Sequence, residues 1–432
     1  MSSGRWDRGR VAALAPDAAA ATAAGGVARP AKWSGAGCDA EAVWGECQGS
    51  GKSVYRSCAD LAGPAFRCSC PSHKIPCKHV LGLLLLWSDG TVEAGARPGW
   101  VAEWLEQRRE RAGRAQERKA GAPKARDPKT VERRERRVED GLAELDQWLR
   151  DQVTHGLAQA EKAPYGLWDD AARRLVDAQA GALSGQVRAL AAIPRQPGWP
   201  DRMLEEYALL RLLVLAYRRR GELPAGLRDT VRSRVGFTVA QDDVLRDGER
   251  VRDRWCATGS RDSVQDQLTT RRVWLRGRET GRPALVLSFA APGASLDSSL
   301  AVGTEVDAEL AFYPGAQPLR ALVAERHGPA VEAVPGGTSV AGFLDEHAAA
   351  LANDPWLERW PATLERVRLA RGEGGALHVV DEAGDALPLR MADPWRLLAV
   401  SGGGPVAFAG EWTPDGLRPL AAWQADEGAV LL

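Results

Sequence analysis

The first 90 residues predict an unpatterned leader, then two short strands, then one helix. Residues 1–35 are rich in Ala and Gly and show no periodicity, so we expect a disordered leader. Residues 42–47 and 53–58 are short apolar stretches on either side of a glycine-rich tract, which predicts two strands joined as a hairpin. A helix is predicted from about Cys77, because apolar residues then recur on one face. That face consists of Val80, Leu83, Leu84 and Trp87.

Helical spacing returns between residues 138 and 248 and predicts a helical domain. Residues 204–217 are apolar on almost every side, which indicates the central buried helix of that domain. Two amphipathic stripes precede this segment. The first comprises Leu142, Leu145, Leu149 and Val153, and the second comprises Trp168, Ala172, Leu175, Gln179, Leu183, Val187 and Leu190.

Strand-like patterns dominate residues 249–432. In residues 306–312 apolar side chains alternate with polar or small ones, which is the pattern of a half-buried strand. Other short β-like runs lie between turns rich in Gly and Pro, and one helix is expected near residues 343–351. These runs are residues 273–275, 285–289, 364–369, 376–380, 387–390 and 406–408. We therefore expect a mixed, β-rich C-terminal domain.

Charge is balanced over the whole chain but not along it. The 432 residues carry 57 basic and 57 acidic side chains, which argues against a generic polyanion binder. Residues 108–137, however, hold thirteen basic and five acidic residues and almost no apolar ones, so we expect a basic charged linker over 106–137, in part helical, rather than a domain. No stretch approaches the roughly 20 apolar residues of a membrane span. We expect a cytoplasmic protein, with export as the lesser alternative because residues 12–24 are a poor signal-peptide core.

The cysteines cluster in one part of the sequence. Six of the seven lie between Cys38 and Cys77, which in a long chain favours metal binding over disulfides. Thiolates and imidazoles are the donors that zinc takes at tetrahedral corners. The pattern Cys-x-Cys, six residues, Cys-x-His supplies four of them, at Cys68, Cys70, Cys77 and His79. Because the protein fills all four positions, we expect one structural zinc ion rather than a catalytic one.

The same segment leaves alternatives open. His73 lies between the two ligand pairs and is the alternative candidate for a ligand, although we expect it to be exposed in the loop. Cys47 and Cys58 are candidates for a disulfide across the hairpin or for a second metal, with burial as small apolar residues the commoner outcome. Residues 51–53 end like a phosphate-binding loop, but Glu46 stands where the first glycine is required, so we do not expect nucleotide binding there.

The ligand pattern and the residues around it resemble the bacterial SWIM zinc-finger family. The similarity covers residues 44–51 before the ligands and 76–87 after them, and residues 274–282 are similar to the C-terminal region of those proteins. By this resemblance the four ligands occupy matching positions, and the family implies zinc binding and interaction with DNA or protein without a defined reaction. The expected architecture is an α+β multidomain protein. It comprises a disordered leader (1–35), a zinc-stapled ββα module (36–105), a basic linker (106–137), a helical domain (138–248) and a β-rich mixed domain (249–432).

We expect a non-enzymatic adaptor whose zinc module addresses a target while residues 138–432 hold a protein partner. Proteins similar to this one are encoded beside AAA+ ATPases and von Willebrand A-type proteins, and the resemblance implies these as partners. The alternative is sequence-independent DNA or RNA binding by the zinc module and the linker together. Its phosphate-contacting residues are Arg133, Arg134, Arg136 and Arg137. An enzyme with its site in the C-terminal domain is a third class, for which the sequence suggests no set of residues.

Overall fold

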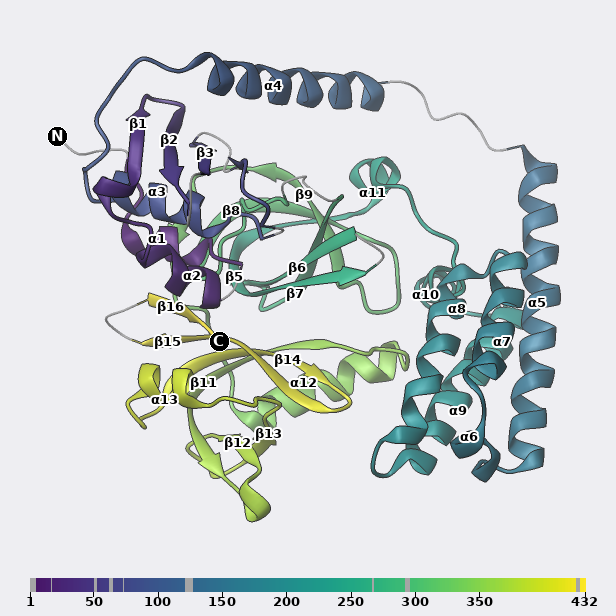
Figure 1. Cartoon of the computed structure of the whole chain (residues 1–432). Coiled ribbons are helices and arrows are strands. Elements are labelled where there is room, and N and C mark those ends of the chain that lie inside the picture. Colours follow the sequence, from purple (N-terminus) through teal and green to yellow (C-terminus); the bar gives the residue numbers. More distant parts are fainter. Residues whose placement is uncertain are drawn as a thin grey trace.

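The chain forms a small N-terminal sheet module, a helical domain, a β-barrel and a C-terminal sheet (Figure 1). The computed structural model describes residues 5–16, 18–49, 53–61, 65–72, 74–120, 127–265, 268–291, 296–424 and 428–432. His73 and most of the glycine-rich tract between the predicted hairpin strands lie outside these residues. None of the helices in the described ranges combines the length and the hydropathy that crossing a membrane requires.

The N-terminal module is a four-stranded antiparallel sheet with a helix on one face. Its strands follow chain order, β1 (Trp33–Cys38), β2 (Ala42–Gln48), β3 (Val54–Asp60) and β4 (Ala65–Cys68). The helix is α3 (Lys78–Ser88), and its apolar residues are buried almost all round. The two strands and the helix predicted from the apolar pattern are therefore present, with one further strand on each side.

The described residues of 1–35 are not disordered, contrary to the sequence-based expectation. They form α1 (Arg8–Ala13), α2 (Ala18–Gly25) and a 3-10 turn, and both helices contact α3. Trp6 packs edge-on against Trp87 of α3, with ring centroids 5.8 Å apart. Alanine side chains are small enough to let the two helices approach α3 closely. Their burial stabilises these helices, although the sequence shows no amphipathic pattern there. The buried residues include Val11, Leu14, Ala15, Ala20 and Ala24.

Gly82 of α3 lies where the N-terminal segment crosses this helix. A Cβ at Gly82 would lie 2.7 Å from Cγ2 of Val27 and 3.3 Å from the carbonyl oxygen of Ala24. We expect Gly82→Ala to lower the free energy of unfolding by about 1–3 kcal/mol, because the crossing segment must shift. In urea unfolding, the control Gly185→Ala should instead be neutral or up to about 1 kcal/mol stabilising, because Gly185 is helical and its added Cβ meets nothing within 4 Å. Equal stability of the two variants would contradict close packing of the N-terminal segment on α3.

The described residues of the predicted basic linker are helical except Asp127, which is the N-cap residue of α5. Helix α4 (Gly99–Ala120) runs into it from the N-terminal side, and α5 (Pro128–His155) begins within it. Val101 and Leu105 of α4 pack on the sheet face opposite α3, in a cluster completed by Ala42, Trp44 and Cys58. The helical part that was expected in the linker thus covers residues 106–120 and 128–137, and apolar contacts just before the linker fix the first turns of α4.

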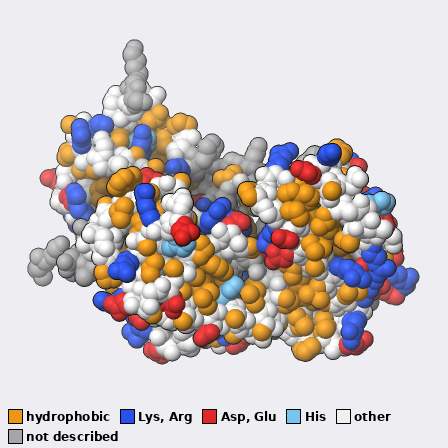
Figure 2. All heavy atoms as spheres, turned by 90° about the horizontal axis from the view of Figure 1, so that it is seen from below, with side chains coloured by type: hydrophobic (Ala, Val, Ile, Leu, Met, Phe, Trp, Pro, Cys, Tyr) orange, Lys and Arg blue, Asp and Glu red, His pale blue; other side chains and the backbone are white. Residues whose placement is uncertain are grey.

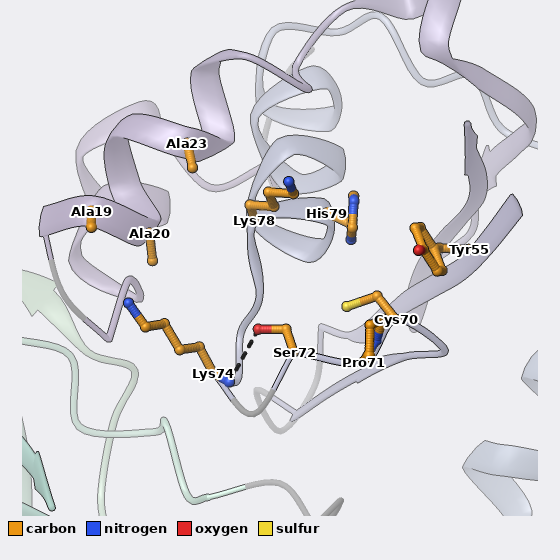
Figure 3. A pocket seen from close by; sticks show the side chains of 10 residues that line it. All are labelled: Ala19, Ala20, Ala23, Tyr55, Cys70, Pro71, Ser72, Lys74, Lys78 and His79. Carbon is orange, nitrogen blue, oxygen red and sulfur yellow. Dashed lines mark hydrogen bonds between the residues drawn. The ribbon is translucent and has the colours of Figure 1, made fainter. Parts of the chain in front are cut away.

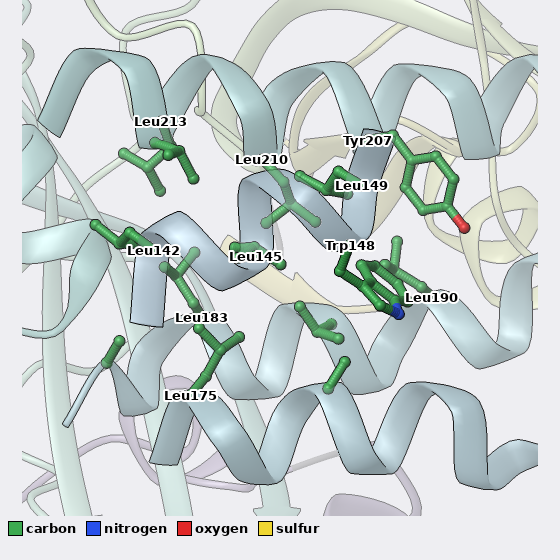
Figure 4. Packing of buried hydrophobic residues seen from close by; sticks show 14 of the residues in the cluster. Leu142, Leu145, Trp148, Leu149, Leu175, Leu183, Leu190, Tyr207, Leu210 and Leu213 are labelled. Carbon is green, nitrogen blue, oxygen red and sulfur yellow. The ribbon is translucent and has the colours of Figure 1, made fainter. Parts of the chain in front are cut away.

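In the described part of the chain, the helical domain consists of six α-helices and one 3-10 helix around one core. After α5 come α6 (Ala158–Lys162), α7 (Tyr165–Asp177), α8 (Gly181–Ala189), the 3-10 helix η2 (Leu190–Arg195), α9 (Trp199–Arg218) and α10 (Ala225–Val235). Leucines from α5, α7, α8 and α9 interlock with Trp148 and Tyr207 (Figure 4). The expectation that residues 204–217 are buried all round is wrong. One face of α9 is buried, and Leu204, Leu212 and Leu215 are exposed.

A short helix, α11 (Gln241–Asp247), leads into the β-barrel. The barrel strands are β5 (Glu249–Gln265), β6 (Leu268–Gly277), β7 (Pro283–Ala290), β8 (Thr304–Phe312) and β9 (Arg320–Arg326), with β10 (Val331–Glu332) at the edge of β8. Strand β8 pairs with both β5 and β9, and β9 pairs in parallel with β7, so five strands close on themselves. Trp255, Leu275, Leu310 and Phe312 lie in its core.

The C-terminal sheet has the strand order β13-β12-β11-β14-β15-β16. These strands are β11 (Trp360–Arg371), β12 (Leu377–Val380), β13 (Ala386–Pro388), β14 (Val406–Thr413), β15 (Gly416–Gln424) and β16 (Gly428–Leu431), with helices α12 (Val340–Asn353) and α13 (Trp395–Ser401). Trp423 and Leu431 share a core with α1 and α3, which joins the two ends of the chain. The expected α+β class, with a small zinc-finger-like module, a helical middle and a β-rich C-terminal part, is confirmed.

Candidate metal centre

Two neighbouring elements of the N-terminal module position the four predicted ligands. Cys68 is the last residue of β4, and Cys70 follows in the turn two residues later. Cys77 is the N-cap residue of α3, and His79 lies in the first turn of that helix. The apolar residues of α3 hold the helix against the sheet. Burial of this helix therefore places Cys77 and His79 next to Cys68 and Cys70.

The four donor atoms converge on one point. The three Sγ atoms and a ring nitrogen of His79 all lie within 4.8 Å of one another. Nδ1 of His79 lies 3.8 Å from Sγ of Cys68 and 3.9 Å from Sγ of Cys77. A tetrahedral zinc ion with Zn–S bonds of ~2.3 Å requires donor separations of about 3.8 Å. The donor set and its spacing therefore fit zinc.

The surroundings of the cluster favour negative charge on the sulfur atoms. Sγ of Cys77 lies at the N-terminus of α3, where the helix dipole stabilises a thiolate. The buried hydroxyl of Ser57 lies 3.1 Å from Sγ of Cys68. The ring of Tyr55 lies against that of His79, with centroids 4.9 Å apart. Ser57 and Tyr55 belong to β3, and no spacing in the sequence distinguishes them from ordinary strand residues.

The pKa values of Cys70, Cys77 and His79 are shifted because the donor groups lie so close together. Contact with Cys68 is the main cause that raises the pKa of His79 to about 9. Hydrogen bonding with Cys68 and Cys77 lowers the pKa of Cys70, and hydrogen bonding with Cys68 and Cys70 raises that of Cys77. A divalent cation that binds the cluster would displace the protons of its thiols.

A surface cavity of about 490 Å³ adjoins one side of the cluster (Figure 3). Cys70 and His79 face into it, and Tyr55 forms part of its wall. Alanines of α2 line the opposite side, and Lys74 and Lys78 add positive charge at the rim. The backbone N–H of Lys74 donates to the hydroxyl of Ser72 at 3.2 Å. The cluster is therefore reachable from solvent on this side, although the protein supplies four ligands.

The remaining cysteines are buried free thiols. The β2–β3 register sets Cys47 opposite Tyr55 and Cys58 opposite Trp44, so the expected alternative of a disulfide between the two cysteines is not formed. Burial raises the pKa of Cys58 to about 12. In the described part of the chain, the only grouping of three or more Cys, His, Asp or Glu with metal-binding spacing is the Cys68 cluster.

The four basic residues proposed for phosphate contact lie on α5, far from the metal cluster. Arg134 donates to the carbonyl oxygen of Gly236 at 2.9 Å, and Arg136 pairs with Glu132. Arg133, Arg134 and Arg137 line a cavity of about 500 Å³ together with Thr130 and Gln179. The structure thus brings three of the four together. Figure 1 shows α5 on the opposite side of the molecule from the zinc module, so the two do not form one surface.

Comparison with known proteins agrees with this arrangement. Residues 67–87 match the family model of the SWIM zinc finger, and residues 133–235 match that of the SWIM-associated four-helix bundle domain. Searches of curated proteins and of solved structures found no match. The first match contains all four residues of the cluster, and the second covers most of the helical domain. The chain therefore carries a SWIM zinc finger followed by the four-helix bundle associated with it.

Proposed function

We propose that the Cys₃His cluster binds one zinc ion as a structural site. The observation that supports this is the convergence of four protein donors, which leaves no coordination position for a water or a substrate. The ion would join the end of β4 to the start of α3 and so hold the helix on its sheet. In this role the zinc shapes a recognition module and does not take part in a reaction, which is consistent with a non-enzymatic protein.

We further propose that the helical domain is the docking part of an adaptor. Leu204, Leu212 and Leu215 of α9 are 49%, 44% and 36% exposed, and their spacing places them with exposed Ala208 on one face of the helix. Hydrophobic side chains gather on the lobe that the helical domain forms (Figure 2). A contiguous apolar patch on a soluble domain marks an interaction site more often than scattered single residues do.

The partner that suits this face is an amphipathic helix of another protein. A stripe with helical spacing accepts the apolar face of a second helix, whose own anchors repeat every three or four residues. The AAA+ ATPases and von Willebrand A-type proteins implied by the family resemblance are the first partners to test. The zinc module would then address the target while α9 holds the partner.

The test is binding of purified full-length chain to a purified AAA+ ATPase and a purified von Willebrand A-type protein of the kinds encoded beside similar proteins, with ATP, with ADP and without nucleotide. We expect Leu212→Asp to weaken this binding at least tenfold, because a carboxylate is then desolvated at the centre of the contact. Val176→Asp, which changes an equally exposed side chain on α7, should bind as the unaltered chain does. No binding in any nucleotide state, or equal loss in both variants, would refute the adaptor proposal.

A further inference from the structure

The strand order of the barrel is one in which ligands are known to bind on one particular outer face. Its strands close in the order β5-β6-β7-β9-β8, with the closing pair β7–β9 parallel and every other pair antiparallel. This is the strand order of the five-stranded Greek-key barrel known as the OB-fold. In that fold, oligonucleotides and oligosaccharides lie across the second and third strands, which here are β6 and β7. Topology alone does not establish a function, so the side chains on that face decide the argument.

Strand alternation identifies those side chains. Val273 and Leu275 of β6 point into the barrel core, together with Ala284 of β7. Neighbouring positions in the sequence therefore point outward. The register pairs Arg272 with Leu287 and with Arg261 of β5, and it pairs Thr270 with Phe289. We call these five outward residues the β6–β7 face: Arg261, Thr270, Arg272, Leu287 and Phe289.

An exposed aromatic ring lies at the open end of the β6–β7 face. Phe289 is 47% exposed, although a phenylalanine on a strand is ordinarily covered. The other end of the outer surface is covered, because Trp274 is fully buried and Arg276 pairs with Glu346 of α12 at 2.7 Å. The available part of the face thus runs from Arg272 to Phe289.

Arginines gather around Arg272. The β6–β7 face contributes two of them, and the C-terminal part of the chain contributes two more, one just before β11 and one in β15. The four are Arg261, Arg272, Arg359 and Arg418. Two acids accompany them: Glu411, which is fully buried 3.3 Å from Arg359, and Asp415, 3.3 Å from Arg418. The cluster therefore has an excess of positive charge.

The arrangement leaves Arg272 short of partners. Its Nε is buried without a hydrogen-bond partner among the described residues. Burial lowers the pKa of Arg272, and the three neighbouring arginines lower it further, against the opposite effect of Glu411. An anion close to Arg272 would supply the missing acceptor and relieve the repulsion between the guanidinium groups.

We propose that the β6–β7 face binds single-stranded nucleic acid, with phosphates at Arg261 and Arg272 and a base stacked on Phe289. Single-stranded binding sites combine positive charge along the backbone with aromatic side chains that stack on bases. In a duplex the bases are stacked on one another, so they cannot stack on the exposed ring of Phe289. This site is distinct from the α5 arginines and from the α9 docking face, and it does not depend on the adaptor proposal.

The test is fluorescence anisotropy of labelled oligo-dT and oligo-U of about 15 nucleotides, with full-length protein. We expect both to bind, with affinity falling about tenfold between about 50 and 200 mM salt as two or three phosphate contacts are screened. Phe289→Ala should weaken binding about 5- to 150-fold, the loss expected for one stacked base, whereas Phe289→Trp should retain it. Arg272→Gln should weaken binding and reduce the salt dependence.

Two control variants separate this site from the rest of the surface. Trp395→Ala removes an exposed aromatic from α13, and Arg133→Gln removes a charge from the α5 cavity, so neither should change the affinity. No binding of either oligonucleotide at low salt would overturn the proposal, as would tighter binding of a duplex. An Arg133→Gln loss as large as that of Arg272→Gln would also overturn it and would place the nucleic acid on α5. Unchanged affinity of Phe289→Ala would exclude stacking and with it the assigned face.

Discussion

Replacing Cys77 by alanine is expected to abolish zinc binding and to unfold the N-terminal module. Cys77 caps α3 and is one of the two ligands that tie this helix to the end of β4. In small zinc-binding domains the apparent binding free energy is about 10–16 kcal/mol and contributes directly to folding. Metal analysis should give one zinc per unaltered chain and none in Cys77→Ala, with protease sensitivity appearing around residues 42–104.

The control for this variant is Cys38→Ala. Cys38 is also buried in the module, but its Sγ lies near the carbonyl oxygen of Val92 at 3.7 Å and outside the ligand cluster. We expect Cys38→Ala to keep one zinc per chain and to resist protease. Normal zinc content in Cys77→Ala would refute the ligand assignment, and loss of zinc in both variants would show that the module unfolds on any disturbance of its core.

The candidate site could be predicted from the sequence because its information is local. Cys68 and His79 are eleven positions apart, and the spacing of the four donors already restricts them to one loop and one helix start. The apolar run after His79 indicated that this helix is buried. What spacing could not predict is the environment of the sulfur atoms. Ser57 and Tyr55 reach the cluster from β3 through sheet register, which no local pattern encodes.

The disordered leader was predicted wrongly for a physical reason. Alanine contributes little contrast between the faces of a helix, so the segment around α2 shows no amphipathic period. Its stability comes from close approach to α3, which depends on the absence of a side chain at Gly82. Such complementarity between two segments is a tertiary property. A sequence pattern therefore does not reveal it.

Long-range ion pairs also join the start of the basic linker to the sheet module. Arg108 pairs with Asp60 at 3.2 Å, and Arg109 pairs with Glu41 at 2.8 Å. Both acids belong to the sheet module, far back in the sequence, so no local pattern shows that these two arginines have partners. The same limit applies to the barrel. Its strands could be predicted one by one, but the parallel pairing of β7 with β9 that closes it could not.

Trp168→Ala is expected to cause the largest loss of stability in the helical domain. Trp168 is almost fully buried, and its ring lies 5.7 Å from that of Trp148 and 6.4 Å from that of Tyr207. Removing a buried tryptophan loses its transfer free energy and leaves a cavity, at a cost of about 3–5 kcal/mol. Urea unfolding followed by the far-ultraviolet circular dichroism of the helices should show this as a lower midpoint for the helical transition.

A matched control lies on α13 at the surface of the C-terminal sheet. Trp395 is 71% exposed, so Trp395→Ala should change the free energy of unfolding by no more than about 0.5 kcal/mol. Trp168→Phe should lie between the two alanine variants, because a smaller ring keeps part of the contact with Trp148 and leaves a smaller cavity. If Trp168→Ala unfolded at the same urea concentration as Trp395→Ala, the aromatic cluster would not be the centre of the bundle core. The stripe of apolar residues on α7 would then have to pack elsewhere, against the arrangement of α5, α7 and α9 described above.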